Sequence, residues 1–272
     1  MEKKSSSFSR RNFFKTSFGT LGAVSGTLAA KSVFGQALNL ETPRQTLGPF
    51  FPDDGDPVKE IRENLDFRLP ISEANDNDLT FLNGHKGKAQ GQIVYLKGKV
   101  LLNKGNGTRE PQPGAVIIMW NASASGRYNH RGDTETTRFK HPKTGKLIER
   151  THDENFQYWG RCITDKQGNY WFKTIVPGFY PVDLEDGWYR PPHLHFMVTA
   201  PAIPQLVTQL YFKGNQVIDN DFIQELNAKD GILRSGRLKA EEQENLVVKY
   251  QKDTTGKITD GLVGNYDFVL SL

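Results

Sequence analysis

Two histidines separated by a single residue are the most suggestive chemical feature of the sequence. His193 and His195 stand at the start of an apolar run that continues to Thr199, and this run predicts a β-strand. Alternate residues of a strand point to the same face, so the two imidazoles would project side by side. Imidazole is the commonest metal ligand in proteins. The pair could therefore bind one metal ion, although such a pair also occurs by chance or serves packing, and its spacing alone leaves both roles open.

Tyrosines are better placed than carboxylates to complete a metal site. The predicted strand carries no Asp or Glu that would form a facial triad with the histidines. Tyr128 and Tyr180 each follow a glycine-containing turn, and a phenol, with a pKa near 10, binds metal as phenolate and favours a hard ion such as Fe(III). Each tyrosine could equally be a packed aromatic side chain.

Arg190 offers a positive charge three residues before the histidine pair. It could stabilise negative charge on a bound substrate. It could also form a structural ion pair with Glu185 or Asp186 in the preceding acidic loop, and the two roles can coexist.

The elements that must position these groups are short strands. Apolar or β-branched runs separated by Gly, Pro and Asn turns predict strands at Ile93–Leu102, Ala115–Trp120, Gly160–Thr164, Tyr170–Thr174, His193–Thr199, Leu206–Phe212 and Tyr266–Leu270. We expect Gly160–Thr164 and Tyr170–Thr174 to form a hairpin, and one short helix within Lys239–Gln251. The fold class predicted is all-β, an antiparallel β-sandwich with long loops, whose sandwich domain covers residues 91–272.

Two irregular segments accompany this domain. Residues 38–90 are rich in Pro, Gly, Asn and Asp and predict an extended N-terminal arm, which Leu47, Phe50 and Phe51 would dock onto the domain. The polar segment Asp133–Gln157 is a long loop directly after Tyr128, and we expect it to restrict the entrance to the site.

The N-terminus predicts export. Arg10 and Arg11 are followed by Phe13, Phe14 and Lys15 and then by a weakly apolar, Gly- and Ala-rich run, which is typical of a twin-arginine signal peptide covering residues 1–37. The run is too short and too weakly apolar for a comfortable membrane span. We therefore expect a periplasmic or secreted protein, exported folded, with no membrane association after signal removal.

Charge and cysteine content exclude several classes of function. Residues 1–37 carry six of the 35 Lys and Arg and one of the 31 Asp and Glu, so the remainder holds 29 of the former and 30 of the latter. A nearly neutral body gives no reason to expect nucleic-acid binding. Cys162 is the single cysteine, so neither an intrachain disulfide nor a zinc–thiolate site is possible.

Several motifs in order resemble the intradiol ring-cleavage dioxygenase family, most of all the branch of the catalytic (beta) subunit of protocatechuate 3,4-dioxygenase. The motifs are Thr46–Pro49, Met119–Ala122, Gly126–His130, Gly160–Asp165, Gly168–Ile175, Pro177–Pro181, Arg190–Phe196 and Thr208–Phe212. The resemblance implies a β-sandwich that holds one non-haem Fe(III) ion. Its implied ligands are Tyr128, Tyr180, His193, His195 and a solvent hydroxide.

The resemblance also implies the reaction. A catechol would bind as a chelating dianion and would be cleaved by O2 between its hydroxylated carbons to a cis,cis-muconate-type diacid. Tyr180 would leave the metal and accept a proton, and Arg190 would stabilise the developing negative charge. Trp120, Gln209 and Val182 would line the substrate pocket, although family members of the protocatechuate branch carry an aromatic residue at the position of Val182. We expect a small-molecule catechol and O2 as partners, and a homo-oligomer.

Two other functions remain open. An exported β-sandwich could bind catechols or catecholate siderophores without turnover, and oxygen consumption would distinguish it from the enzyme. A zinc hydrolase would need a ligand set without phenolates.

Overall fold

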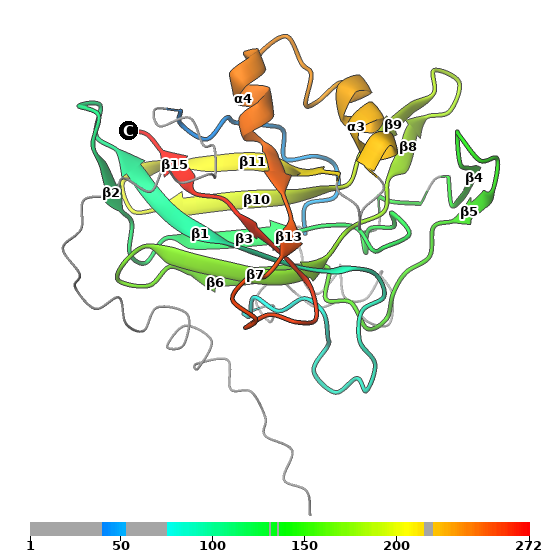
Figure 1. The fold of residues 1–272 in the computed structure, drawn as a ribbon, viewed down its shortest axis with the longest axis horizontal. Helices are drawn as coiled ribbons and strands as arrows, with labels where there is room; N and C mark the ends of the chain where they lie inside the picture. The colour runs from blue at the N-terminus through cyan, green and yellow to red at the C-terminus, as the bar shows by residue number, and fades with distance from the viewer. Residues whose placement is uncertain (1–39, 53–74, 131, 135, 215–219) are drawn as a thin grey trace, which may run out of the picture. The chain divides into compact units, whose positions relative to one another are not determined.

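Two β-sheets make up most of the described part of the chain. The structure is a computed structural model and describes residues 40–52, 75–130, 132–134, 136–214 and 220–272, so the predicted signal peptide and part of the predicted arm lie outside it. One sheet has the strand order β13-β14-β1-β15, with β2 and β7 also paired to β1, and the other has the order β12-β11-β10-β3-β6 (Figure 1). The remaining strands in these described ranges form two small two-stranded ribbons, β4-β5 and β8-β9.

The strands of the first sheet are β1 (Ile93–Asn103), β2 (Arg109–Pro111), β7 (Asn169–Ile175), β13 (Gln251–Lys252), β14 (Leu262–Asn265) and β15 (Phe268–Leu270). Those of the second are β3 (Val116–Trp120), β6 (Trp159–Ile163), β10 (His193–Ala200), β11 (Ile203–Lys213) and β12 (Val247–Lys249). The ribbons are β4 (Arg138–Lys140) with β5 (Leu147–Glu149) and β8 (Tyr180–Asp183) with β9 (Trp188–Arg190). Most pairings are antiparallel, but β1 pairs with β14 and β15, and β11 with β12, in parallel.

The core lies between the two sheets. Phe196 of β10 contacts Phe172 of β7, with ring centroids 6.2 Å apart, and Phe268 of β15, with centroids 5.0 Å apart. All three side chains are fully buried. Burial of each such ring stabilises the fold by roughly 1.5–3 kcal/mol. The predicted all-β sandwich is therefore confirmed.

The face of β10 that looks away from this core carries the histidine pair. Leu194, Phe196 and Val198 are buried against the core, and His193 and His195 alternate with them along the strand. The two histidines consequently lie on the outer face of the five-stranded sheet, where the predicted side-by-side projection is realised.

The predicted hairpin between Gly160–Thr164 and Tyr170–Thr174 is wrong. Both strands exist, but β6 pairs with β3 in one sheet and β7 pairs with β1 in the other. The turn between them is tight, with the N–H of Gly168 donating to the carbonyl of Asp165, and it carries the chain from one layer to the other.

Two helices occur in the described ranges. α3 (Asn220–Lys229) follows β11 and was not among the predicted elements, although its buried residues Phe222, Ile223 and Leu226 have the spacing of one helical face. α4 (Ala240–Asn245) is the helix expected within Lys239–Gln251, but it ends early because the chain enters β12 at Val247. Neither of these two described helices is long and apolar enough to cross a membrane.

The described parts of the arm are mostly irregular, and its apolar residues are docked. Leu47, Phe50 and Phe51 pack against the core. The N–H of Gln45 donates to the carbonyl of Val207 in β11, at 2.9 Å. The arm therefore runs along the edge of β11 and reaches the histidine pair at Gly48, next to the ring of His195.

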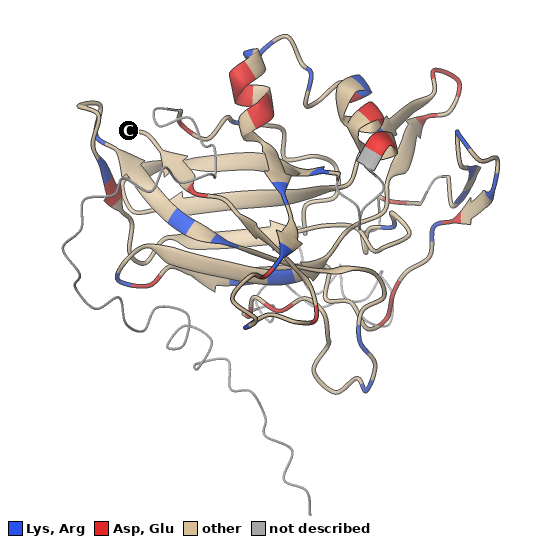
Figure 2. Cartoon of the chain, viewed as in Figure 1, with Lys and Arg blue, Asp and Glu red and all other residues tan. Residues whose placement is uncertain are grey.

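Lys, Arg, Asp and Glu residues lie mainly on the loops, the helices and the outer strands in Figure 2, whereas β3 and β10 contain none. Two glutamates, Glu241 and Glu242, occupy the first turn of α4, where the positive end of the helix dipole stabilises their negative charge.

Candidate metal centre and active site

The two histidine side chains meet end to end on β10. Both are 2% exposed, and their Nε2 atoms are 3.1 Å apart. The Nδ1 atom of His193 lies 2.6 Å from the carbonyl oxygen of Pro191, a contact that requires Nδ1 to carry the proton. The Nε2 lone pair of neutral His193 is thereby directed at its neighbours.

Tyr128 supplies a third donor at the same point. Its hydroxyl oxygen lies 3.2 Å from Nε2 of His193 and 3.1 Å from Nε2 of His195. Tyr128 follows a tight turn at Gly126, which has a φ of +83°, and its backbone N–H donates to Asp133 at 2.7 Å. The turn thus delivers a buried phenol from a distant part of the sequence to the histidine pair.

Tyr180 approaches from the β8-β9 ribbon. It lies directly opposite Arg190 in that ribbon, so the two predicted functional residues are cross-strand neighbours. Its ring meets that of Tyr128 edge to face, with centroids 5.8 Å apart, and its centroid lies 6.0 Å from that of His193. The four predicted ligands Tyr128, Tyr180, His193 and His195 are therefore gathered in one buried cluster.

The donor atoms fit a metal ion better than they satisfy one another. Three mutual contacts near 3.1 Å share at most two protons, and Nδ1 of His195 has no hydrogen-bond partner among the described residues. Adjacent ligands around a metal at bond lengths of about 2.1 Å lie about 3 Å apart, which matches this triangle. No cluster of three or more His, Cys, Asp or Glu in the described ranges could hold a metal, so a metal here would depend on the phenols.

Burial dominates the protonation of these groups. It lowers the pKa values of His193 and His195 well below the usual value, with the charge of Arg190 acting in the same direction. Burial also raises the pKa values of Tyr128 and Tyr180. The histidines are therefore ready as neutral ligands, whereas the phenols must lose protons when they bind a cation.

Arg190 is held beside this cluster by three side chains. Its Nε donates to Asp230 at 2.9 Å, and its Nη2 donates to Gln209 at 2.6 Å and to Tyr211 at 3.3 Å. Burial opposes its charge, but Tyr180 and Asp230 favour the charged form and the pKa of Arg190 is raised. Neither Glu185 nor Asp186 is its partner, because the ion pair is formed with Asp230.

The arm covers the cluster. Gly48 has a φ of +78°, and a Cβ there would lie 3.0 Å from Cε1 of His195. The ring of Phe50 lies 4.7 Å from that of Tyr128 and 6.4 Å from that of Tyr180, measured between centroids. The arm thus forms one wall of the site.

A cavity of about 340 Å³ opens beside Tyr180 and Arg190. This volume is in the range of small-molecule sites. Apolar lining comes mainly from Pro49, Phe50, Pro181, Val182, Trp188 and Ile232, and the charged lining residues are Asp133, Arg150 and Arg190. Val182 is 49% exposed on the β8-β9 ribbon.

Trp120 and Gln209 flank the histidines in the sheet. Both are paired with His195 across neighbouring strands. The indole ring of Trp120 stacks on His195 with centroids 4.8 Å apart, and the Gln209 amide donates to the carbonyl of Thr46 at 2.8 Å. Trp120 therefore supports His195, and Gln209 supports the arm and Arg190. Neither Trp120 nor Gln209 is among the described residues that line the cavity.

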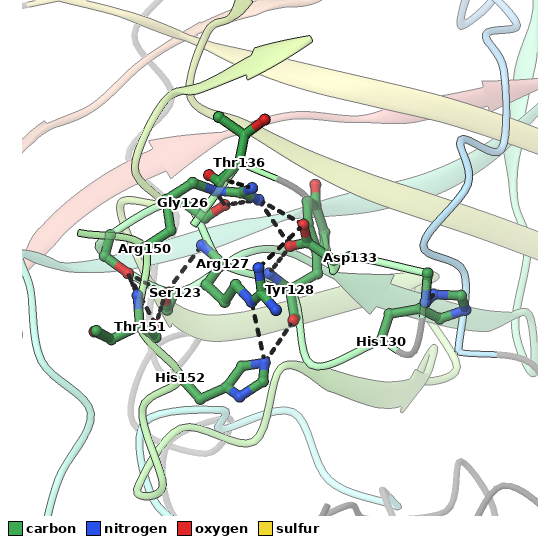
Figure 3. A network of polar contacts seen from close by, with 12 residues as sticks. Ser123, Gly126, Arg127, Tyr128, His130, Asp133, Thr136, Arg150, Thr151 and His152 are labelled. Atoms are coloured by element: carbon green, nitrogen blue, oxygen red, sulfur yellow. Dashed lines mark hydrogen bonds and ion pairs between the residues drawn. The ribbon is translucent and has the colours of Figure 1, made fainter. Parts of the chain in front are cut away.

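A buried polar network stands behind Tyr128 (Figure 3). Asp133 and Arg150 form an ion pair at 2.7 Å with side chains 3% and 2% exposed. Gly132, Asp133, Thr136 and Arg150 also line the cavity. The ends of the predicted Asp133–Gln157 loop therefore belong to the site, and its middle forms the β4-β5 ribbon. Its role in restricting the entrance stays a prediction.

Sequence reasoning missed several of these contacts. Tyr211 could have been found, because it stands two residues after Gln209 on one strand face. Asp230 follows α3, and Arg150 follows a polar ribbon, so neither has a local signal. His152 was not singled out either, and it is partly buried with Nε2 at 3.1 Å from the carbonyl oxygen of Tyr128.

Comparison with known proteins gives a consistent result. A family model described as "Dioxygenase" matches residues 70–271. The protocatechuate 3,4-dioxygenase beta chain of Burkholderia cepacia is 32% identical over 172 residues, which cover 61% of this chain and 66% of the relative. Hydroxyquinol 1,2-dioxygenase of Corynebacterium glutamicum is 27% identical over 221 residues, covering 77% of this chain and 58% of the relative. The chain therefore spans less than two thirds of the length of either relative.

Among solved structures, an intradiol ring-cleavage dioxygenase from Tetranychus urticae superimposes with a TM-score of 0.52 at 18% identity. The alignment covers 86% of this chain and 95% of that one. At this level of identity the likeness supports the sandwich fold alone.

Proposed function

The chain belongs to the intradiol ring-cleavage dioxygenase family, and on that premise we propose that it cleaves a catechol with O2 between the two hydroxylated carbons. The product would be a cis,cis-muconate-type dicarboxylic acid. Catechol and O2 together contain all the atoms of that product, so the reaction needs no external reductant. The observation that carries the proposal is the convergence of Tyr128, His193 and His195 donor atoms within 3.2 Å of one another.

A mononuclear non-haem Fe(III) ion is the proposed cofactor, with Tyr128, Tyr180, His193 and His195 as its protein ligands. Two phenolates suit a hard, highly charged cation, and two neutral imidazoles complete the donor set. When bound, Fe(III) would draw electron density from a chelated catecholate and open a ring carbon to attack by O2.

Tyr180 is the proposed base for the substrate. Burial raises the pKa of this phenol in the absence of a cation, so its oxygen, when not bound to the metal, would have a high affinity for a proton from a catechol hydroxyl. Its position on the rim of the cavity gives it direct access to a bound catechol, whereas Tyr128 lies deeper, under Phe50.

Arg190 is the proposed electrostatic stabiliser. It lines the cavity, and its ion pair with Asp230 and its hydrogen bond to Gln209 fix its orientation before substrate arrives. A preoriented guanidinium stabilises negative charge on ring oxygens without reorganisation during the reaction.

The cavity lining favours a catechol with uncharged ring substituents. Each described charged residue at the wall already has an ion-pair partner: Asp133 pairs with both Arg150 and Arg127, and Arg190 pairs with Asp230. Burying a substrate carboxylate without a cationic partner would be unfavourable. The apolar side chains of Val182, Trp188 and Ile232 would instead contact alkyl or aryl groups.

We also propose that the reaction takes place outside the cytoplasm. Residues 1–37 lie outside the described ranges, and the support is the order of Arg10, Arg11, Phe14 and Lys15 before a weakly apolar run. The twin-arginine route exports folded proteins, which would allow the metal to be bound before export.

Oxygen uptake with a panel of catechols tests the proposed function. We expect consumption with catechol and 4-methylcatechol, and at least about tenfold lower kcat/KM for a carboxyl-substituted catechol because of its uncompensated charge. A spectral change on catechol binding without oxygen consumption would instead support a binding protein. Equal rates for the charged and uncharged substrates would contradict the proposed preference alone.

A further inference from the structure

The ion pair between Arg150 and Asp133 is buried although it belongs to a polar loop. Arg150 Nη2 lies 2.8 Å from Oδ1 and 2.7 Å from Oδ2 of Asp133. Asp133 Oδ2 also accepts the backbone N–H of Tyr128, at 2.7 Å. The carboxylate therefore connects Arg150 to the main chain of a proposed metal ligand (Figure 3).

Arg150 makes two further contacts toward the site. Its Nε and Nη2 both donate to the carbonyl of Gly126, at 3.0 and 2.7 Å, which fixes the turn that precedes Tyr128. Its guanidinium carbon lies 5.1 Å from the centre of the Tyr180 ring, a cation–π distance. The Arg150 side chain thus contacts both the turn that precedes Tyr128 and the ring of Tyr180.

The turn before Tyr128 and the segment before Tyr180 are also packed against each other. A Cβ at Gly126 would lie 2.6 Å from the carbonyl oxygen of Phe179, so the turn before Tyr128 rests on the residue before Tyr180. The N–H of Gly178 donates to the carbonyl of Ser123 at 2.9 Å. A shift of the Gly126 turn would therefore displace both phenols together.

We propose that Arg150, with Asp133, is a positioning residue that holds Tyr128 and Tyr180 in the geometry needed to bind the metal. This inference rests on the proposed function, because it concerns the same ligand cluster. The proposal gives the Asp133–Gln157 loop a specific role: Asp133 and Arg150 position the ligands, and the β4-β5 ribbon between them is not required for this role. Partners that orient metal ligands influence affinity or activity by about 10–100-fold when removed.

The test compares Arg150→Gln and Arg150→Lys in the full-length protein. Gln removes the charge and the forked hydrogen bonds, whereas Lys keeps the charge but cannot contact Gly126 and Asp133 in the same bidentate manner. Arg138→Gln is the matched control, because Arg138 pairs with Glu149 at 2.9 Å in the same loop but is 69% exposed. The readouts are iron affinity by competition with a chelator, the phenolate-to-iron absorption band, and thermal unfolding of the iron-free protein.

We expect Arg150→Gln to lower iron affinity by about 10–100-fold and to shift or weaken the absorption band, with Arg138→Gln unchanged in both. If Arg150→Gln does not fold, Arg150→Lys decides: lower affinity and a shifted band in a folded protein support the proposal, and wild-type values of both overturn it. A folded Arg150→Gln protein with wild-type affinity and band would likewise reduce Arg150 to a structural role. A wild-type protein that binds no iron would overturn the proposed function, and this inference with it.

Discussion

The ion pair between Arg190 and Asp230 allows a quantitative prediction for Asp230→Asn. The pair is almost completely enclosed, with side chains 6% and 0% exposed and an N–O distance of 2.9 Å. Asn occupies nearly the same volume and can still accept the N–H of Leu233, which Asp230 accepts at 3.0 Å. The substitution therefore removes mainly the negative charge opposite Arg190.

The expected cost follows from leaving that guanidinium buried without its counterion. Removing one partner of a buried pair typically costs about 3–5 kcal/mol in the free energy of unfolding. For a domain of this size, each kcal/mol lowers Tm by about 2–4 °C, so we expect a decrease of about 6–20 °C.

The assay is urea and thermal unfolding of the iron-free protein. Glu185→Gln and Asp186→Asn are matched controls, because both residues lie on the neighbouring exposed loop and are not the ion-pair partner of Arg190. Each control should change the free energy of unfolding by less than about 0.5 kcal/mol. The double variant Arg190→Met with Asp230→Leu should lose less stability than the sum of the two single variants, since neither charge is then left alone.

A loss below about 1 kcal/mol for Asp230→Asn would refute the reasoning, because such a value is typical of an exposed pair. Additive single and double variants would refute it as well. If Asp230→Asn is destabilised as expected, its kcat should also fall, since Arg190 would have lost one of the groups that orient it.

Two further predictions concern the arm and the histidines. Gly48→Ala places a Cβ 3.0 Å from Cε1 of His195 at a φ of +78°, so it should cost more than the 1–2 kcal/mol or so of left-handed backbone strain and should also weaken iron binding. Gly84→Ala is the control, because Gly84 has a similar φ of +85° and no atom lies near the new Cβ. This variant should lose only the free energy of unfolding that backbone strain costs, and its iron affinity should not change. Equal losses of stability and iron affinity in the two variants would contradict the proposed effect of the contact with His195. Burial lowers the pKa values of His193 and His195 below 6.5, so the unfolded chain takes up protons that the native chain excludes, and the iron-free protein should lose stability as pH falls below about 6.5. Urea unfolding across that range should show a weaker pH dependence when both histidines are replaced by Gln, and an unchanged dependence would exclude them as its source.

Strand alternation predicted the most of the site. The spacing of His193 and His195 placed both imidazoles on one face, and the apolar residues between and after them placed the opposite face in the core. The same rule covers Gln209 and Tyr211 on β11. Local patterns of this kind act within one element and can be read without knowing its neighbours.

Contacts between distant segments could not be predicted in the same way. The partner of Arg190 is 40 residues away, after a helix that was not predicted, while the nearby Glu185 and Asp186 are exposed. The turn between Asp165 and Gly168 exists, but the strands on either side of it do not pair with each other. A turn sequence does not determine which sheet each flanking strand joins. The identification of Tyr128 and Tyr180 as ligands came from the family resemblance, since a tyrosine in a turn carries no signal of its own.

The measurement that tests the central claim most directly is the visible spectrum and iron content of the purified protein, recorded with Tyr180→Phe beside the wild type. We expect about one iron per chain and a phenolate-to-iron absorption band, which Tyr180→Phe should weaken or shift while Tyr128 still binds the metal. Addition of catechol under air should change the band and consume O2. A colourless wild-type protein without iron after expression in iron-replete medium would contradict the proposed metal centre.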